Sequence, residues 1–335
     1  MTSPAGRARL AALVLAGVLA VAVLLAIRFG SVPLTTAQVL GALRGVGDPV
    51  HRDIVVQLRL PRALLAILVG GGLALAGATF QALLRNPLAE PYILGISGGA
   101  AAAAVLALGL GVVAIGSWVL PAAAFAGALL AIALVFRVAT AVDRSLDVRV
   151  LLLAGVVVGA FFGAVIAFVL SLSDAPTVRG AVLWMMGSLG GADWRSVAVA
   201  AAYTLPAALV LAALSRSLDL MALGEETAAH LGADVERVKR TAFGVASLIT
   251  AAGVAVAGVI GFVGLIVPHA VRLAVGTSYR ALLPLSFLAG AAFLVLADLI
   301  ARVVLAPAEL PIGVVTAFVG APFFAGLLWM GARRR

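Results

Sequence analysis

Long apolar runs of about 20 residues, separated by short polar segments, are the main pattern of the sequence. They fall near residues 10–27, 62–84, 93–113, 115–136, 150–171, 193–213, 281–303 and 312–331. A helix needs about 20 apolar residues to cross the hydrocarbon core of a bilayer, whereas the strands of a membrane barrel are shorter and alternate. The pattern therefore predicts an all-α integral membrane protein. Residues 35–45 are too short and polar to span, and they predict a short amphipathic helix on the outer surface.

The stretch from 241 to 274 is also apolar, but it is too long for one crossing and short for two. Glycines and Pro268 divide it, because proline ends or kinks a helix. Arg7, Arg9 and the arginines at 333–335 predict that both chain ends are cytoplasmic, which requires an even number of crossings. We therefore expect two spans here, 241–258 and 259–274, and ten transmembrane helices in a single domain over residues 1–335.

Composition supports this fold class and removes others. The 335 residues are 64% hydrophobic and only 11% charged, which excludes a soluble domain. The formal net charge is +9, but Lys239 is the only lysine and the arginines are scattered among loops, so we expect a lipid bilayer and no nucleic acid as a partner. The predicted topology places 15 basic residues inside and 8 outside, the direction of the positive-inside rule. The eight outside are Arg28, Arg44, Arg52, Arg59, Arg62, Arg179, Arg195 and Arg302.

The longest charged loop, residues 215–240, is predicted to be cytoplasmic. Glycine followed by two glutamates at 224–226 indicates a helix start, Gly232 its end, and Asp234 the cap of a second short helix. We expect two short helices that present an apolar and acidic face to a cytoplasmic protein; the alternative is an amphipathic connector lying on lipid. The residues expected to form this face are Leu218, Met221, Leu223, Gly224, Glu225, Glu226 and Leu231.

Three arginines on the predicted outer side need an explanation. Arg59 and Arg62 open the second long span, against both the charge bias and the helix dipole. Arg302 ends the ninth span, four residues after Asp298, an order that favours an ion pair. One hypothesis is that the arginines form a docking patch for an acidic partner outside. The alternatives are headgroup anchoring by long side chains and simple neutralisation of Arg302 by Asp298.

The segment RNPLAEPYILGISGGA, residues 85–100, interrupts the apolar pattern. Its prolines cannot continue a helix, and its glycines would let chains pack closely. Ser97 also fits the pattern of intramembrane serine proteases, a weak match that needs a histidine, for which His269 is the only candidate. Farther along, Arg179 could line an entrance for an anionic cargo or anchor at the interface, and Met185 could ligate haem iron or fill a gap. The candidate pathway residues are Gly95, Ser97, Gly98, Arg179 and Met185.

The sequence lacks the motifs of a self-powered transporter. No phosphate-binding G-x-x-x-x-G-K-[ST] motif occurs, because the only lysine, Lys239, is followed by Arg240. Asp298 is isolated within its span, whereas ion-coupled carriers use a series of such acids, which disfavours a stand-alone carrier. If the chain moves a solute uphill, we expect another protein to supply the energy and to attach at residues 215–240.

Five motifs of this sequence also occur, in the same order, in one protein family. They are LRLPRALLAILVGGGLALAGATFQALLRNPLAEPYILGISGGA (58–100), MALGEETAAHLG (221–232), GFVGLIVPHAVRL (261–273), LADLIAR (296–302) and AELPIGVVTAFVGAPFF (308–324). In these motifs the chain resembles the membrane permease subunits of type II ABC importers for cobalamin, ferric siderophores and haem. The resemblance covers nearly the whole chain.

This resemblance implies ten helices per subunit in the bacterial inner membrane, with alternating access driven by partners. The implied partners are a second copy of the chain, two cytoplasmic ATPases that bind ATP and magnesium, and one periplasmic substrate-binding protein. The chain itself would bind no cofactor and would be no enzyme. The ATPases would couple through Gly224, Glu225, Glu226 and Leu231, and the binding protein would meet Arg59, Arg62 and Arg302. For the cargo we favour an iron compound, haem first and a ferric siderophore next, with cobalamin as the alternative.

Overall fold

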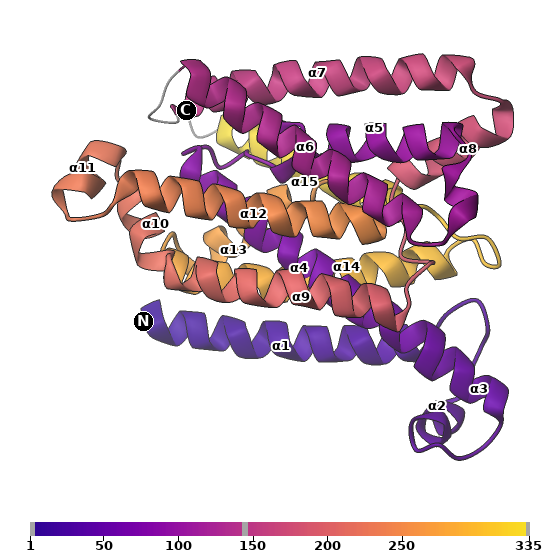
Figure 1. The fold of residues 1–335 in the computed structure, drawn as a ribbon. Helices are drawn as coiled ribbons and strands as arrows, with labels where there is room; N and C mark the ends of the chain where they lie inside the picture. Colours follow the sequence, from indigo (N-terminus) through magenta and orange to yellow (C-terminus); the bar gives the residue numbers. More distant parts are fainter. Residues whose placement is uncertain (1–3, 143–146, 333–335) are drawn as a thin grey trace.

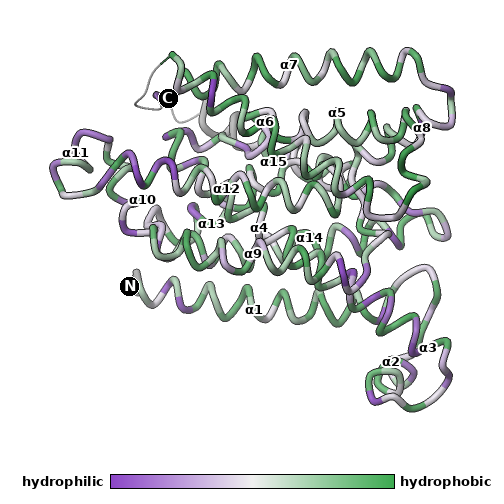
Figure 2. The backbone as a smooth tube through the Cα atoms, in the orientation of Figure 1, coloured by the Kyte–Doolittle hydropathy of each residue, from purple (hydrophilic) through white to green (hydrophobic). Residues whose placement is uncertain are grey.

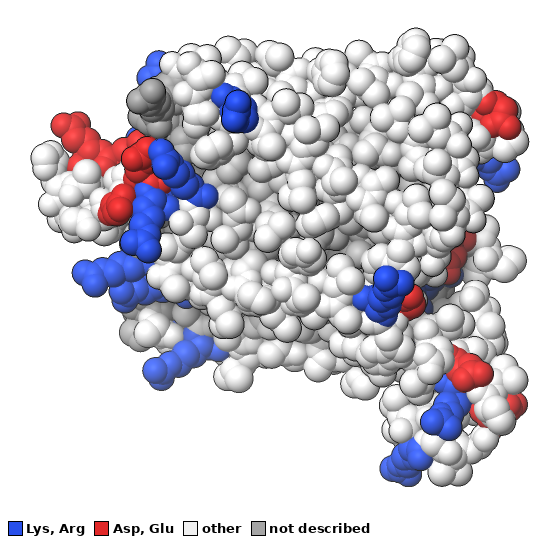
Figure 3. All heavy atoms as spheres, in the orientation of Figure 1, with Lys and Arg blue, Asp and Glu red and all other residues white. Residues whose placement is uncertain are grey.

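The computed structural model describes residues 4–142 and 147–332, and all regular structure in these ranges is helical. Figure 1 shows long helices running side by side along one direction, with short helices at both ends. On the face drawn in Figure 3, nearly all charged side chains lie towards the two ends, and a wide uncharged band lies between them. Hydropathy along the backbone follows the same division (Figure 2). Arg144 and the arginines at 333–335, used in the charge argument, lie outside the described residues.

The helices fall into two length classes. The long or strongly apolar ones are α1 (Pro4–Arg28), α4 (Leu60–Leu83), α5 (Ile96–Gly109), α6 (Val119–Val142), α7 (Val148–Leu172), α9 (Trp194–Ala213), α12 (Val235–Ala257), α13 (Val263–Val275), α14 (Tyr279–Val303) and α15 (Ile312–Ala332). The short ones are α2 (Thr36–Leu43), α3 (Pro49–Asp53), α8 (Ala175–Met185), α10 (Ser215–Met221) and α11 (Glu225–His230). Single turns occur at η1 (Ile54–Arg59), η2 (Pro91–Leu94) and η3 (Val112–Ile115).

Seven helices of the described chain are long and apolar enough to cross a membrane. Three further apolar helices are shorter, namely α5, α13 and the segment Ile312–Gly326 of α15. The fold is therefore that of an all-helical, multi-pass membrane protein. The ten predicted crossings would need all three shorter helices to span as well.

Helix α4 forms the core and packs against α9, α12, α13 and α14 (Figure 1). Glycines make this possible, because a missing side chain lets two backbones touch. A Cβ atom added at Gly77 would lie 1.9 Å from the carbonyl oxygen of Gly264 in α13. At Gly70 it would lie 2.4 Å from the carbonyl oxygen of Gly290 in α14. Any side chain at these positions would force the helices apart.

Several predicted span boundaries are wrong, for local reasons. The span expected at 62–84 belongs to a continuous helical stretch of 35 residues from Pro49 to Leu83, so Arg59 and Arg62 lie inside it and not at its positive end. The span expected at 93–113 is reduced to α5, because Gly95 and Gly111 adopt positive φ angles that interrupt the helix. The span expected at 115–136 lies at 119–142 instead. The short helix expected at 35–45 is confirmed as α2.

The division of residues 241–274 into two helices is confirmed, with a break at 258–262. However, α12 begins already at Val235, and Asp234 caps this long helix by accepting a hydrogen bond from the Arg237 N–H at 3.1 Å. The charged loop therefore ends at 234, and the second short helix predicted there is wrong. The apolar stretch could not reveal this, because the first turns of α12 are charged and extend beyond the apolar run.

Candidate functional site

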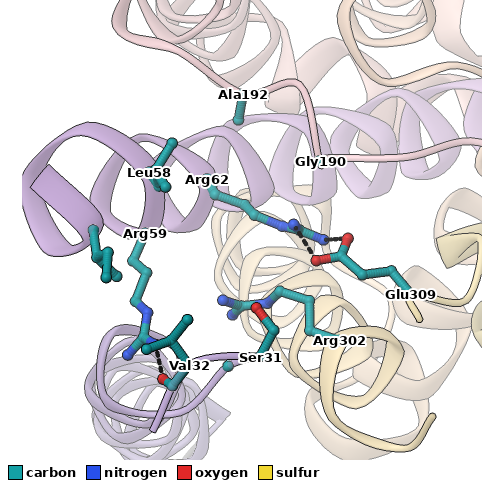
Figure 4. A pocket seen from close by; sticks show the side chains of 11 residues that line it. Ser31, Val32, Leu58, Arg59, Arg62, Gly190, Ala192, Arg302 and Glu309 are labelled. Atoms are coloured by element: carbon teal, nitrogen blue, oxygen red, sulfur yellow. Dashed lines mark hydrogen bonds and ion pairs between the residues drawn. The ribbon is translucent and has the colours of Figure 1, made fainter. Parts of the chain in front are cut away.

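Five charged side chains gather at the end of the bundle where α14 ends and the helix containing Arg59 and Arg62 passes it. We call Arg59, Arg62, Asp298, Arg302 and Glu309 the arginine cluster. A pocket of about 230 Å³ lies beside them, also lined by loop residues that follow α1 and precede α9. Figure 4 shows Arg62 extended towards Glu309 and Arg59 turned towards Val32, with Arg302 beside them. The three arginines predicted to act together are thus brought together.

Arg59 and Arg302 stabilise the end of α1. Arg59 donates hydrogen bonds to the carbonyl oxygens of Ile27 and Arg28, at 2.8 and 2.7 Å, and to that of Val32. Arg302 donates to the carbonyl of Ala26 at 3.2 Å. The last carbonyls of a helix lack intrahelical donors and carry its negative dipole end, so two guanidinium groups are favourable there.

Arg62 lies between two carboxylates. Its Nε and Nη2 are both 2.9 Å from Oδ1 of Asp298, and its Nη1 and Nη2 are 3.0 and 2.9 Å from the oxygens of Glu309. Arg302 Nε lies 3.0 Å from Oδ2 of Asp298, which confirms the predicted Asp298–Arg302 pair. Asp298 is only 2% exposed, and a buried carboxylate of this kind requires such compensation.

The cluster differs from the predicted patch of free surface charges. Arg59 and Arg302 are each only 5% exposed and bond to their own chain. Glu309, which lies in the motif AELPIG, was not among the predicted site residues. Its sequence signal was available, since Glu309 is the only acidic residue between α14 and α15 and lies close in sequence to Arg302. Three arginines and two carboxylates leave a formal charge of +1 beside the pocket.

Two other arginines predicted to lie outside have aromatic partners. The Arg195 guanidinium lies 4.4 Å from the centroid of the Trp118 ring, and that of Arg28 lies 5.1 Å from the Phe29 ring. Stacking of this kind is attractive and common where a membrane protein meets the headgroups. It favours interface anchoring as the role of these two residues.

At the opposite end, α10 is packed into the bundle (Figure 1). Leu218 and Met221 are 0% and 1% exposed, so the prediction that they lie on a solvated face is wrong. Asp219 fixes α10 to the start of α14: it accepts hydrogen bonds from the Tyr279 N–H at 2.6 Å and the Ser278 hydroxyl at 3.1 Å. Leu218 is buried because α10 packs against α14.

Helix α11 carries the exposed part of this end. Glu225 lies 2.8 Å from the buried ammonium group of Lys239 in α12, which holds the helix in place. Glu226 remains exposed, as do Leu223 and Leu231 at 66% and 58%. Gly224 has φ +119°, a value that favours glycine, immediately before the helix start predicted at Glu225. The predicted apolar and acidic surface therefore exists, but it consists of Leu223, Glu226 and Leu231.

A polar pocket of about 280 Å³ lies next to α10 and reaches the ends of α4, α13 and α14. Within it, Arg272 donates to Oε1 of Gln81 at 3.0 Å. The amide nitrogen of Gln81 in turn approaches the carbonyl oxygens of Gly264 and Leu265, both at 3.3 Å. These hydrogen bonds join the end of α4 to α13.

The segment 85–100 holds the break before α13. Glu90 accepts a hydrogen bond from the Phe262 N–H at 2.7 Å, and the Tyr92 hydroxyl accepts one from the Ile260 N–H at 3.2 Å. Phe262 has φ +70°, an uncommon value for a bulky residue. Burial raises the pKa of Glu90 and of Tyr92, and the Phe262 N–H partly offsets this for Glu90. The segment 85–100, which interrupts the apolar pattern of the sequence, therefore stabilises the break at 258–262 between α12 and α13.

Two of the pathway candidates lie against α7. Gly95 and Gly98 pack against Gly159 and Phe162 of α7, as expected for glycines that allow close approach. Among the described residues no hydrogen bond joins Ser97 to His269. The His269 ring lies beside that of Phe324, with ring centroids 6.2 Å apart. The intramembrane protease hypothesis therefore gains no support from the geometry.

Helix α8 carries the other two candidates and contacts α5. Arg179 is exposed and Met185 half-buried. Asp174 caps α8 by accepting a hydrogen bond from the Thr177 N–H at 3.0 Å, and hydrogen bonds from Thr177 lower the pKa of Asp174.

Comparison with known proteins decides the family. The model of the FecCD transport family matches residues 18–330. The chain belongs to the FecCD transport family. The uncharacterized ABC transporter permease protein YvrB of Bacillus subtilis (strain 168) is 42% identical over 320 residues, which cover 92% of this chain and 90% of YvrB. FecCD membership confirms the resemblance seen in the five motifs.

Two further relatives of this FecCD chain have named cargo. The cobalamin import system permease protein BtuC of Halobacterium salinarum is 47% identical, covering 84% of this chain and 75% of that protein. The vitamin B12 import system permease protein BtuC of Escherichia coli O157:H7 is 43% identical, covering 83% and 84%. These relatives support the cobalamin alternative better than the haem prediction, which no comparison supports specifically.

Solved structures agree on the fold. An inward-facing conformation of a candidate metal-chelate type ABC transporter has a TM-score of 0.84 at 32% identity, covering 94% of this chain and 97% of that one. PsaBC from Streptococcus pneumoniae has a TM-score of 0.56 at 15% identity, over 87% of this chain and 94% of that one, and shares the fold alone. The FecCD chain is therefore a type II ABC importer permease.

Proposed function

We propose that this permease carries cobalamin, with another metal chelate as the second candidate and haem no longer preferred. The observation that supports this is the 43–47% identity to cobalamin import permeases over more than four fifths of the chain. The second candidate follows from the structural similarity to the metal-chelate type transporter. In this proposal the chain binds no cofactor of its own, and ATP and magnesium bind to the partner ATPases.

The proposed architecture is one transmembrane domain with ten membrane crossings. Seven are the long helices, and α5, α13 and α15 would supply the other three. Both chain ends would face the cytoplasm of a bacterial inner membrane. The functional unit would be a homodimer with two ATPases and one periplasmic binding protein. Large exposed apolar side chains on α7 and α15, such as Phe161 and Phe318, are available for contact with a second copy or with lipid.

We propose that the binding protein docks at the arginine cluster. Glu309 then has a definite role, because it holds Arg62 until an acidic side chain of the partner competes for it. Glu309→Gln removes this competition and should strengthen binding. Arg62→Gln should weaken binding at least about tenfold, the usual cost of truncating one member of a charge pair. Arg52→Gln, on an exposed neighbouring arginine, is the matched control.

The ATPases would attach at α11, where Leu223, Glu226 and Leu231 are exposed. ATP-driven closure would move α11, and Lys239 and Asp219 would pass that motion to α12 and α14. Glu226→Arg should uncouple transport from ATP hydrolysis with unchanged thermal stability. Glu236→Arg, also exposed but on α12, is the control. Normal transport by the Glu226 variant would remove this assignment.

The test of cargo is ATPase activity in proteoliposomes that contain this permease and its neighbouring ATPase. The cognate binding protein is added loaded with cobalamin, a ferric siderophore or haem. Stimulation by the cobalamin form alone is the expected result. Stimulation by haem alone would overturn the proposed cargo and leave the importer assignment intact. No stimulation by any form, with an intact complex, would place the cargo outside these three compounds.

A further inference from the structure

A wholly apolar cleft of about 500 Å³ opens on the surface of the bundle between α4, α9 and α14. Leu205, Leu209 and Ala212 form one wall, and Leu283, Phe287 and Leu288 form the other. Leu205 and Leu209 are largely exposed, so this cleft opens on the outer surface of the chain and not into its interior. No charged or hydrogen-bonding side chain lines it. Its occupant must therefore be apolar where it enters.

The helices leave this space for identifiable reasons. Both walls contain a proline, Pro206 in α9 and Pro284 in α14, and proline interrupts helical hydrogen bonding. Pro284 leaves the carbonyl of Arg280 without its usual donor. The floor is flat, because the Phe287 ring lies over Gly71 of α4, where an added Cβ would be 2.7 Å from the ring. The cleft is thus built by backbone and packing, not by a mobile loop.

Two arginines lie at one mouth of the cleft. Arg280 lies on the same face of α14 as the cleft residues of that helix, because they follow it at helical spacings of three, four, seven and eight positions. These residues are Leu283, Pro284, Phe287 and Leu288. Arg216 lies on α10, three residues before Asp219, whose carboxylate accepts a hydrogen bond from the N–H of Tyr279, the residue next to Arg280. Both arginines are exposed, and the described residues provide neither with an ion pair.

The surrounding charges favour an anion at this mouth. Asp219 lies on the same short helix as Arg216, but its two oxygens already accept hydrogen bonds from the Tyr279 N–H and the Ser278 hydroxyl. Figure 3 shows Lys and Arg side chains at the end of the molecule where α10 and α11 lie, together with Asp and Glu side chains. The axial distance from Arg280 to Leu288 is about 12 Å, close to the roughly 15 Å of one leaflet of hydrocarbon.

We propose that this cleft binds one anionic phospholipid of the leaflet at that end of the molecule. One acyl chain lies along Leu209 and Leu288, and the phosphate lies between Arg216 and Arg280. An apolar groove with a paired cationic mouth has the two parts that such a lipid needs. The bound lipid would join α10 to the start of α14, alongside the Asp219 hydrogen bonds. This site is separate from the docking and coupling surfaces proposed above.

The test uses the full chain in detergent, titrated with phosphatidylglycerol or phosphatidylcholine and followed by native mass spectrometry. The wild type should bind one phosphatidylglycerol on the order of 30-fold more tightly than phosphatidylcholine, from about fivefold for each arginine. The double variant Arg216→Gln/Arg280→Gln should bind both lipids equally. Leu209→Trp, which fills the cleft at an exposed position, should bind neither at this site. Arg149→Gln, an exposed arginine at the start of α7, is the control.

Equal binding of the two lipids by the wild type would overturn the proposal. So would an unchanged preference in the double variant, since the arginines would then not select the headgroup. An unchanged preference in Leu209→Trp would overturn the cleft as the seat of the acyl chain. A stable dimer that forms without lipid and is lost in Leu209→Trp would identify a second copy of the chain as the occupant instead.

Discussion

The two ends of the molecule use charge in opposite ways. In the arginine cluster, Asp298 is buried and bonded to two arginines, and Arg59 caps α1. At the α11 end, Glu226 and Leu231 face outwards. The buried members of the cluster, Asp298 and Arg59, are part of the fold, whereas Glu226 and Leu231 are available to a partner. Burial and pairing, not the presence of charge, therefore separate a structural residue from a candidate contact.

The largest expected effect is at Asp298. Asp298→Ala leaves Arg62 and Arg302 without their shared carboxylate, and breaking a buried charge pair of this kind costs about 3–5 kcal/mol. Thermal unfolding of the purified permease in detergent measures the loss. Asp174→Ala, which removes an exposed helix cap, should lower the unfolding temperature much less and serves as the control. Equal effects of the two substitutions would contradict the structural role of the cluster.

The second prediction compares two leucines of the same loop. Leu218→Ala should destabilise the protein by about 2–5 kcal/mol, because it opens a cavity at a fully buried position. Leu223→Ala, at an exposed position, should change stability by less than about 0.5 kcal/mol. Unfolding in detergent checks stability, and coupled ATPase activity should fall only for Leu223→Ala among well-folded variants. Similar stability losses would show that α10 is not packed as described.

A smaller effect distinguishes the two adjacent glutamates. Glu225→Gln removes the ion pair with Lys239 and should weaken the attachment of α11 by about 1 kcal/mol. Glu226→Gln has no such pair to lose and should leave the helix in place. Hydrogen exchange of the α11 backbone amides measures both. Faster exchange in the Glu226 variant than in the Glu225 variant would reverse the assignment.

The smallest effect concerns pH and Glu90. Burial raises the pKa of Glu90 above its ordinary value of 4.5, so the folded state binds a proton more readily than the unfolded state. Stability from this residue therefore increases as the pH falls through the raised folded pKa towards 4.5, and is lost as the pH rises. Glu90→Gln should abolish that part of the pH dependence. We would compare unfolding temperatures of both proteins between pH 7 and pH 5, and parallel curves would refute the prediction.

The sequence predicted membrane helices better than their ends. An apolar run marks where a helix can enter lipid, so 193–213 and 281–303 were placed within a few residues of α9 and α14. The start of α12 was misplaced because charged turns before Phe243 belong to the helix but not to the hydrocarbon. The glycines at 95 and 111 shortened α5 because their positive φ angles depend on the surrounding packing.

The sequence by itself determined the membrane class, the division of residues 241–274, the family motifs and the Asp298–Arg302 pair, because each depends on neighbours close in the chain. Only the tertiary structure decided that Arg59 caps α1, that Glu309 holds Arg62, and that Leu218 is buried. Those contacts join residues as far as 247 positions apart. A local pattern shows which side chains are charged or apolar, but helix packing decides which partner each one meets and whether water can reach it.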